Sequence, residues 1–122
     1  MGAARRRGAD GEGYGRFAEA LCAAALERDG FTVLARRHRT AAGEIDLIAR
    51  RDDLTVIVEV KARARAAEAA AALSLRQRAR LIAAAEIVMA EKPDWFGCSL
   101  RFDVMVVGRD GTLRRIADAF RA

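Results

Sequence analysis

The chain has 122 residues and a formal net charge of +5, with 52% hydrophobic and 32% charged residues. This length supports one hydrophobic core but not two. The basic balance favours anionic partners, and the lack of an apolar run of about 18 residues argues against a membrane-spanning helix.

Cys22 and Cys98 are the two cysteines, and His38 is the one histidine. The sequence contains neither a Cys-x-x-Cys pair nor a Cys/His cluster, so we expect neither a disulfide framework nor a soft-metal site. Basic residues near the N-terminus are not followed by the apolar segment of a secretory signal. We therefore expect a cytoplasmic protein without a membrane partner.

Residues 1–13 contain four glycines and the run Arg5-Arg6-Arg7, a composition that predicts a disordered basic N-terminal tail. This tail is either an arm on nucleic acid or an ordinary mobile terminus. Residues 14–122 are expected to form a single domain. Residues 14–29 repeat apolar side chains at helical spacing before Gly30, which predicts an amphipathic helix.

A strand is predicted over residues 31–39, followed by a hairpin with strands at 45–49 and 54–60. If Asp52-Asp53 forms a two-residue turn, the register places Asp46 opposite Glu59. Strict alternation then brings to one face of the hairpin Glu44, Asp46, Ile48, Ile57, Glu59 and Lys61.

The carboxylates on this face repel one another, by about 4 kcal/mol for two charges at 4 Å and an effective dielectric constant near 20. A divalent cation relieves this repulsion, and hard oxygen ligands select Mg²⁺, Mn²⁺ or Ca²⁺ over softer metals. The alternative is a solvated strand face in which Glu44 and Lys61 form a cross-strand salt bridge.

Residues 75–89 form a predicted helix that ends before Pro93, with Arg76 and Arg80 on one face. Residues 99–107 and 112–118 are predicted strands joined by a glycine-containing turn. The order αβββαββ indicates an α/β (α+β) domain with a mixed five-stranded sheet flanked by helices.

The arrangement of Asp46 and Glu59-Val60-Lys61 resembles the metal-binding core of the PD-(D/E)XK nuclease superfamily, which has a restriction endonuclease-like fold. Residues 43–49 and 58–61, together with Arg63, resemble the signature of the YraN family of uncharacterised bacterial proteins. Their nearest functional relatives in fold are the archaeal Holliday junction resolvases.

The resemblance implies a Mg²⁺- or Mn²⁺-dependent endonuclease acting on DNA, including branched intermediates of repair and recombination, and a possible homodimer. Asp46, Glu59 and the Val60 carbonyl are expected to hold the metal, with Glu44 as a supporting residue. Lys61 and Glu19 are expected to assist catalysis, Glu19 because the spacing from Gly15 fits the family pattern.

Nucleic-acid contacts are expected from a set of basic and polar residues near these acids: Arg36, Arg39, Arg63, Arg76 and Gln77. The alternative for each is a solvated surface position. Two other functions stay open: a nucleic-acid-binding module that keeps the nuclease fold without the chemistry, and a protein-interaction domain of a DNA-repair assembly. The second would act through Trp95 and Phe96, which otherwise close the core.

Overall fold

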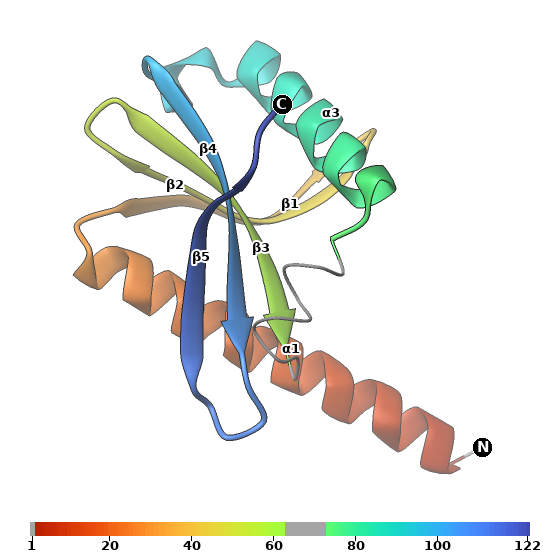
Figure 1. The fold of residues 1–122 in the computed structure, drawn as a ribbon. Coiled ribbons are helices and arrows are strands. Elements are labelled where there is room, and N and C mark those ends of the chain that lie inside the picture. Colours follow the sequence, from red (N-terminus) through yellow and green to blue (C-terminus); the bar gives the residue numbers. More distant parts are fainter. Residues whose placement is uncertain (1, 63–72) are drawn as a thin grey trace.

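The computed structural model describes residues 2–62 and 73–122 of the chain. The elements are, in order, α1 (Gly2–Arg28), β1 (Thr32–Thr40), β2 (Gly43–Arg51), β3 (Leu54–Ala62), α3 (Leu75–Glu91), the 3₁₀ turn η1 (Pro93–Trp95), β4 (Ser99–Val107) and β5 (Leu113–Phe120) (Figure 1). This succession confirms the predicted order αβββαββ.

The strands form one five-stranded sheet in the order β1-β2-β3-β4-β5. Neighbouring strands are antiparallel except β3 and β4, which are parallel. A parallel pair requires the chain to return along the sheet between the two strands, and the segment that contains α3 makes this crossover. The predicted mixed sheet is therefore confirmed.

One helix covers each face of the sheet, α1 on one side and α3 on the other (Figure 1). On the α1 face, Leu26 packs with Leu47 and Val58. On the α3 face, Leu81 packs with Ile57 in a second buried cluster. Because both faces of β2 and β3 are buried, these strands are apolar along most of their length.

The β2–β3 hairpin has the predicted register. Ile48 pairs with Ile57 and Arg51 with Leu54, so Asp52 and Asp53 form the two-residue turn. Asp52 has a φ of 53°, a left-handed conformation that aspartate adopts more readily than branched residues do. The local turn chemistry therefore sets the register of the strands that carry the candidate acids.

Helix α1 begins at Gly2, whereas the apolar spacing predicts a helix that starts at Tyr14. Ala3 and Ala4 are strong helix formers, and extending an existing helix costs less than starting one. The N-terminal part of α1 extends away from the sheet (Figure 1). The mobility predicted for these residues stays a prediction.

Helix α3 begins with a reciprocal cap. The Ser74 Oγ accepts a hydrogen bond from the Gln77 backbone N–H (3.1 Å), and the Gln77 Oε1 accepts one from the Ser74 N–H (3.2 Å). This pairing satisfies two backbone donors at the helix start. Pro93 follows the helix, which ends at Glu91, slightly beyond the predicted end.

The aromatic link between α3 and β4 lies against the core. Trp95 and Phe96 are half-buried and pack on the cluster beneath α3. The Thr55 Oγ1 donates a hydrogen bond to the Trp95 carbonyl oxygen (2.6 Å), and the His38 ring meets Trp95 edge-on with 5.6 Å between ring centroids. These contacts give the link a structural role, and its role in binding a partner stays a prediction.

Candidate metal centre

Strand β2 loses its regular alternation at Asp46. Ile45 and Ile48 both pack in the α3 cluster, whereas Leu47 packs in the α1 cluster. The expectation that strict alternation places Glu44 and Asp46 on the face of Ile48 is therefore wrong. The physical reason is that β2 separates from β3 beyond the Leu47–Val58 pair, which frees its backbone to rotate.

The Asp46 side chain accepts a hydrogen bond that a backbone carbonyl of β2 would accept in a regular sheet. Its Oδ2 accepts a hydrogen bond from the Val60 backbone N–H (2.8 Å). In the regular register, the backbone of Ile45 would face Val60. Since the N–H and C=O of one residue in a strand point to the same neighbour, the Val60 carbonyl also faces the side of Asp46.

The Asp46 carboxyl also hydrogen-bonds the Glu59 carboxyl, so the two predicted acids meet although they are not a ladder pair. Burial raises the pKa of Asp46 to about 8, and the hydrogen bond and negative charge of Glu59 contribute further. The Val60 N–H opposes this shift, while the charge of Glu19 adds to it. Burial and the neighbouring Glu59 therefore both favour the protonated form of Asp46 at neutral pH.

Helix α1 brings Glu19 to the same place, as the family resemblance implies. Carboxylate oxygens of Glu19, Glu44 and Asp46 all lie within 4.8 Å of one another. Together with Glu59, these residues form what we call the acidic cluster, contributed by α1, β2 and β3. Its donors are all carboxylate oxygens, the ligands that Mg²⁺ and Mn²⁺ prefer. The residues present therefore fit the expected metal.

Each acid beside Asp46 has a cation near it. Lys61 Nζ lies 3.5 Å from Glu59 Oε2, and Arg80 Nη2 lies 3.7 Å from the same oxygen. The Arg37 Nε donates a hydrogen bond to Glu19 Oε1 (2.6 Å).

Glu44 pairs loosely with Arg39, whose Nε is 3.8 Å from its Oε2. The alternative interpretation, a cross-strand salt bridge between Glu44 and Lys61, is not what the described residues form: Glu44 pairs with Arg39 and Lys61 with Glu59.

Arg37 and Arg80 were missed as site residues. Arg37 stands in an arginine-rich run, and its φ of 50° belongs to an irregularity that strand patterns do not reveal. Arg80 was placed only on a helix face shared with Arg76. No local signal showed that its side chain reaches the acidic cluster, because that contact depends on how α3 packs over the sheet.

The residues predicted to bind nucleic acid lie on β1 and at the start of α3, apart from Arg63. Arg36 and Arg39 are exposed on the edge strand β1, and Arg76 is exposed in the first turn of α3. Gln77 caps α3 with its side-chain oxygen. Arg63 lies outside the described residues. Of the exposed arginines, Arg39 contacts the acidic cluster through Glu44, and the contacts of all three with nucleic acid stay a prediction.

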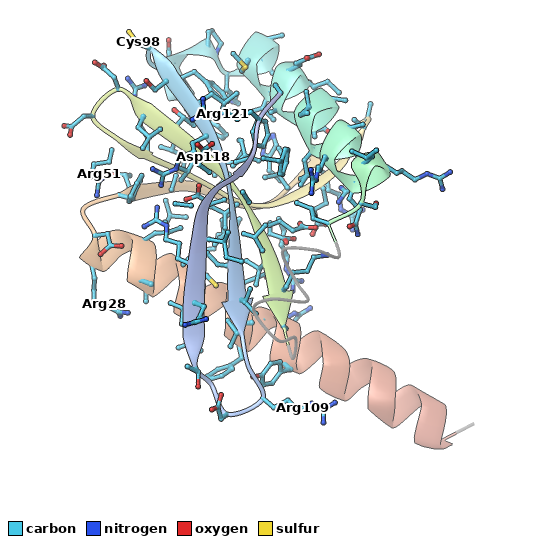
Figure 2. All side chains as sticks on the ribbon, in the orientation of Figure 1. Arg28, Arg51, Cys98, Arg109, Asp118 and Arg121 are labelled. Atoms are coloured by element: carbon cyan, nitrogen blue, oxygen red, sulfur yellow. The ribbon has the colours of Figure 1, made fainter. Side chains whose placement is uncertain are left out.

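Cys22 lies next to the acidic cluster and is buried, whereas Cys98 is exposed near the start of β4 (Figure 2). Both thiols are free, as predicted. Burial, together with the nearby carboxylates of Asp46 and Glu19, raises the pKa of Cys22 to about 12. We expect an alkylating reagent to modify the native protein once, at Cys98, and the denatured protein twice, by mass spectrometry.

A Cys98→Ser variant serves as the control and should show no native labelling. Rapid modification of Cys22 in the folded protein would contradict the packing of α1 against Asp46.

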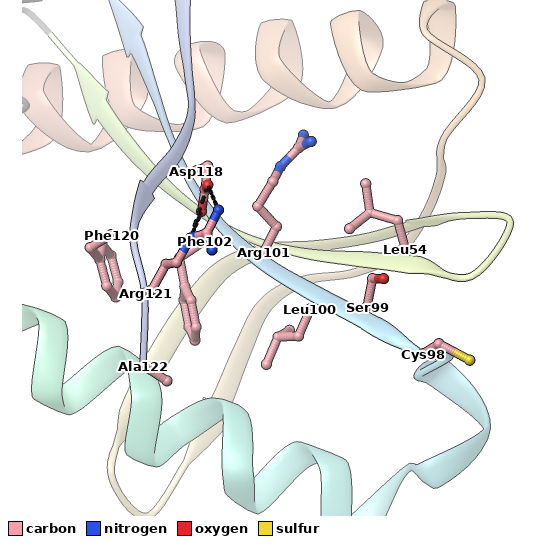
Figure 3. Close-up of a pocket in the computed structure, with 10 residues that line it drawn as sticks. All are labelled: Leu54, Cys98, Ser99, Leu100, Arg101, Phe102, Asp118, Phe120, Arg121 and Ala122. Atoms are coloured by element: carbon pink, nitrogen blue, oxygen red, sulfur yellow. Dashed lines mark hydrogen bonds and ion pairs between the residues drawn. The ribbon is translucent and has the colours of Figure 1, made fainter.

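A cavity of about 470 Å³ lies away from the acidic cluster, between the start of β4 and the end of β5 (Figure 3). Phe102 and Phe120 contribute apolar surface to it. Its charged groups are engaged within the protein: Arg121 pairs with Asp118 at 2.7 Å, and Arg101 with Asp103 at 2.8 Å. This cavity therefore offers no cluster of acids comparable to the candidate metal centre.

The chain is similar throughout to a family of bacterial proteins. A model described as the uncharacterised protein family UPF0102 matches residues 18–107. A UPF0102 protein of Azorhizobium caulinodans is 51% identical over 117 residues, which cover 96% of this chain and 89% of the relative. A UPF0102 protein of Acidiphilium cryptum is 50% identical over 121 residues, covering 98% of this chain and 91% of the relative.

A third relative, the UPF0102 protein of Granulibacter bethesdensis, is 53% identical over 115 residues, covering 94% of this chain and 73% of the relative. In the part of the chain that the structure describes, no helix has the length and apolar character to cross a membrane. The matched segment contains the whole acidic cluster. The chain therefore belongs to the UPF0102 family, the YraN-like family that its hairpin signature indicates.

Proposed function

We propose that this protein is a metal-dependent nuclease that hydrolyses phosphodiester bonds of DNA. One observation carries the proposal: carboxylate oxygens of Glu19, Glu44 and Asp46 lie within 4.8 Å of one another, and Asp46 also interacts with Glu59. A divalent cation can neutralise the negative charge that these acids bring together. Strongly perturbed carboxyl groups beside a lysine are typical of functional sites.

Asp46, Glu59 and the Val60 carbonyl would hold Mg²⁺ or Mn²⁺, and Glu19 would assist from α1. When bound, the metal supplies charge neutralisation at the phosphoryl oxygens and polarises the attacking water. Lys61, whose Nζ lies 3.5 Å from Glu59 Oε2, orients the nucleophile and stabilises the negative charge that develops on the phosphate. Glu44 tunes the charge of the centre.

The substrate class follows from charge. The chain has a net charge of +5, and Arg37, Arg39 and Arg80 each lie within 4 Å of an acid of the cluster. Positive charge around a carboxylate centre attracts a polyanion. We therefore propose a DNA substrate, and the resemblance to Holliday junction resolvases favours branched repair or recombination intermediates, cut by a homodimer in the cytoplasm.

A second candidate function is a non-catalytic nucleic-acid-binding module with the same fold. The ion pairs of Arg37 with Glu19, Lys61 with Glu59 and Arg39 with Glu44 favour it, because internal cations already offset part of the negative charge. In such a module the acids would hold the fold together, and the arginines would bind nucleic acid without a metal.

The test is calorimetric titration of Mg²⁺ and Mn²⁺ into the wild type, Asp46→Ala and Glu59→Ala, alone and with a non-cleavable DNA junction, together with a cleavage assay on the corresponding cleavable junction. We expect the wild type to bind metal and to cleave DNA, and both variants to lose metal binding and cleavage. Glu86→Ala removes an exposed carboxylate from α3 and should behave as the wild type. Full metal-dependent cleavage by Asp46→Ala would overturn the proposal, and DNA binding without metal binding would favour the binding module.

A further inference from the structure

Arg80 reaches from α3 to the point where β2 leaves the acidic cluster. Its Nη1 donates a hydrogen bond to the Glu44 carbonyl oxygen (3.1 Å), and its Nη2 lies 3.7 Å from Glu59 Oε2. The second distance exceeds that of a hydrogen bond. A guanidinium group has five N–H donors, and 35% of this side chain is exposed. Arg80 can therefore bind an added anion without leaving its place.

Gly43 makes room for the Arg80 side chain. A Cβ atom at this position would lie 2.7 Å from Arg80 Nη1 and 3.1 Å from its Cδ. Gly43 also has a φ of 136°, which residues other than glycine rarely adopt. The turn between β1 and β2 is thus shaped so that the Arg80 side chain passes across it.

A hollow of about 260 Å³ lies at the same turn and is lined by Arg39, Thr40, Gly43 and Glu44. The Thr40 Oγ1 donates a hydrogen bond to the Gly43 carbonyl oxygen (2.7 Å) and accepts one from the Ala42 N–H (3.1 Å), which holds the turn in shape. Since Arg80 contacts Gly43 and Glu44, which line the hollow, the guanidinium groups of Arg39 and Arg80 border the same turn.

Arg39 is the more exposed of the two arginines. Its side chain is 90% exposed, and its ion pair with Glu44 spans 3.8 Å. Such an exposed and loosely paired contact contributes little to stability. The side chain is therefore available to a ligand that enters the hollow.

We propose that Arg80 and Arg39 bind a phosphate of the nucleic-acid backbone at this turn between β1 and β2, where Arg39 lines the hollow and Arg80 contacts Glu44. The inference rests on the proposed function. The positive charges of Arg80 and Arg39 would offset the repulsion between the DNA backbone and the four carboxyl groups of the acidic cluster. Planar guanidinium groups match phosphate oxygens with paired hydrogen bonds. Lys61 belongs to β3 and lies next to Glu59. In this proposal it acts on the reacting phosphate, whereas Arg80 and Arg39 bind the neighbouring one.

The experiment measures binding of a fluorescent DNA duplex by anisotropy, in EDTA and over a range of salt concentrations. We expect Arg80→Ala and Arg39→Ala each to weaken binding about fivefold to tenfold and to reduce the slope of log affinity against log salt by about 0.9, the value for one lost phosphate contact. The control is Arg109→Ala, which removes the same charge from the exposed β4–β5 turn (Figure 2). Equal affinities of Arg80→Ala and Arg109→Ala would overturn the assignment.

Loss of Arg80 also leaves Glu59 with less positive charge nearby, so a weaker affinity alone does not prove a contact. The double variant Arg80→Ala/Glu59→Gln has the net charge of the wild type. We expect it to bind more weakly than Glu59→Gln by the same factor that separates Arg80→Ala from the wild type. If the double variant binds DNA as tightly as Glu59→Gln does, Arg80 acts only by offsetting the charge of Glu59. That result would overturn the phosphate site.

Gly43→Ala provides an independent test, because it displaces the Arg80 side chain without removing its charge. It should weaken DNA binding about as much as Arg80→Ala does, in a protein whose circular dichroism spectrum is unchanged. If folded Gly43→Ala binds DNA with wild-type affinity, the position of the Arg80 side chain against Gly43 does not matter for DNA binding.

The two proposals fail in different ways. Metal binding and cleavage by the wild type, with no special effect of Arg80→Ala, would reject the phosphate site and leave the nuclease proposal standing. An Arg80-dependent loss of DNA affinity in a protein that binds no metal would reject the nuclease and keep the phosphate site. A wild-type protein that binds no DNA would overturn the phosphate site outright.

Discussion

Replacing Asp46 with asparagine is expected to remove most of the pH dependence of stability between pH 5 and pH 8. The folded protein raises the pKa of the Asp46 carboxyl to about 8, whereas an unfolded aspartate titrates near pH 4. Between these values the folded state holds a proton that the unfolded state has released. The free energy of unfolding of the wild type therefore falls as the pH rises, by about 2 to 4 kcal/mol across this window.

Asparagine has the shape of the protonated aspartate. It can accept the hydrogen bond from the Val60 N–H and donate one to Glu59, and it does not titrate. Asp46→Asn should therefore be about as stable as the wild type at pH 5 and more stable than it at pH 8. Urea denaturation at a series of pH values measures both effects.

Asp53→Asn is the matched control, because it neutralises an exposed carboxylate in the β2–β3 turn and should keep the wild-type pH dependence. Parallel stability curves for the wild type and Asp46→Asn would mean that folding does not raise the pKa of the Asp46 carboxyl. Added Mg²⁺ should stabilise the wild type at pH 8 and leave Asp46→Asn unchanged, since a bound cation stabilises the state that binds it.

Asp103 in β4 is the centre of a buried network of charges on the α1 face. It is 1% exposed and accepts paired hydrogen bonds from Arg101 Nε (2.8 Å) and Nη2 (2.9 Å). Arg115 Nε donates a third (3.2 Å), and the Asp118 backbone N–H a fourth (3.0 Å). The left-handed Asp118, with a φ of 54°, lies where the β4–β5 register shifts. The irregularity of β5 thus directs a backbone donor to the carboxylate.

Replacing Asp103 with alanine is expected to destabilise the protein by about 3 to 5 kcal/mol, the range found when one partner of a buried ion pair is removed. The substitution leaves the guanidinium groups of Arg101 and Arg115 and the Asp118 N–H without their acceptor. Asp103→Asn keeps an acceptor for part of the network and should lose less. The free energies follow from urea denaturation at neutral pH.

Glu86→Ala is the control for this prediction as well, since it removes an exposed carboxylate from α3 and should change stability by no more than about 0.5 kcal/mol. A loss below about 1 kcal/mol in Asp103→Ala would indicate that the arginines find water or other acceptors, and that the network contributes no more than a surface pair does.

Local patterns in the sequence were enough to predict the secondary structure and the sheet type. The β2–β3 hairpin follows from two apolar runs around Asp52 and Asp53, because turn residues set the register of adjacent strands. The crossover between β3 and β4 follows from the predicted helix between them, which ends before Pro93. These features depend on residues close together in the chain, so they can be predicted without knowing which distant residues are in contact. The start of α1 at Gly2 was missed, because propagation from an existing helix outweighed the glycines.

For the candidate metal centre too, some features follow from the sequence and others only from the tertiary structure. The sequence alone identified Asp46, Glu59 and Lys61 as neighbours, since they belong to one hairpin, and a family resemblance added Glu19. Only the tertiary structure decided how they meet: β2 separates from β3 at Asp46, α1 carries Glu19 to Glu44, and α3 carries Arg80 across Gly43. Those contacts join residues far apart in the chain, and their geometry is set by how the helices pack on the sheet.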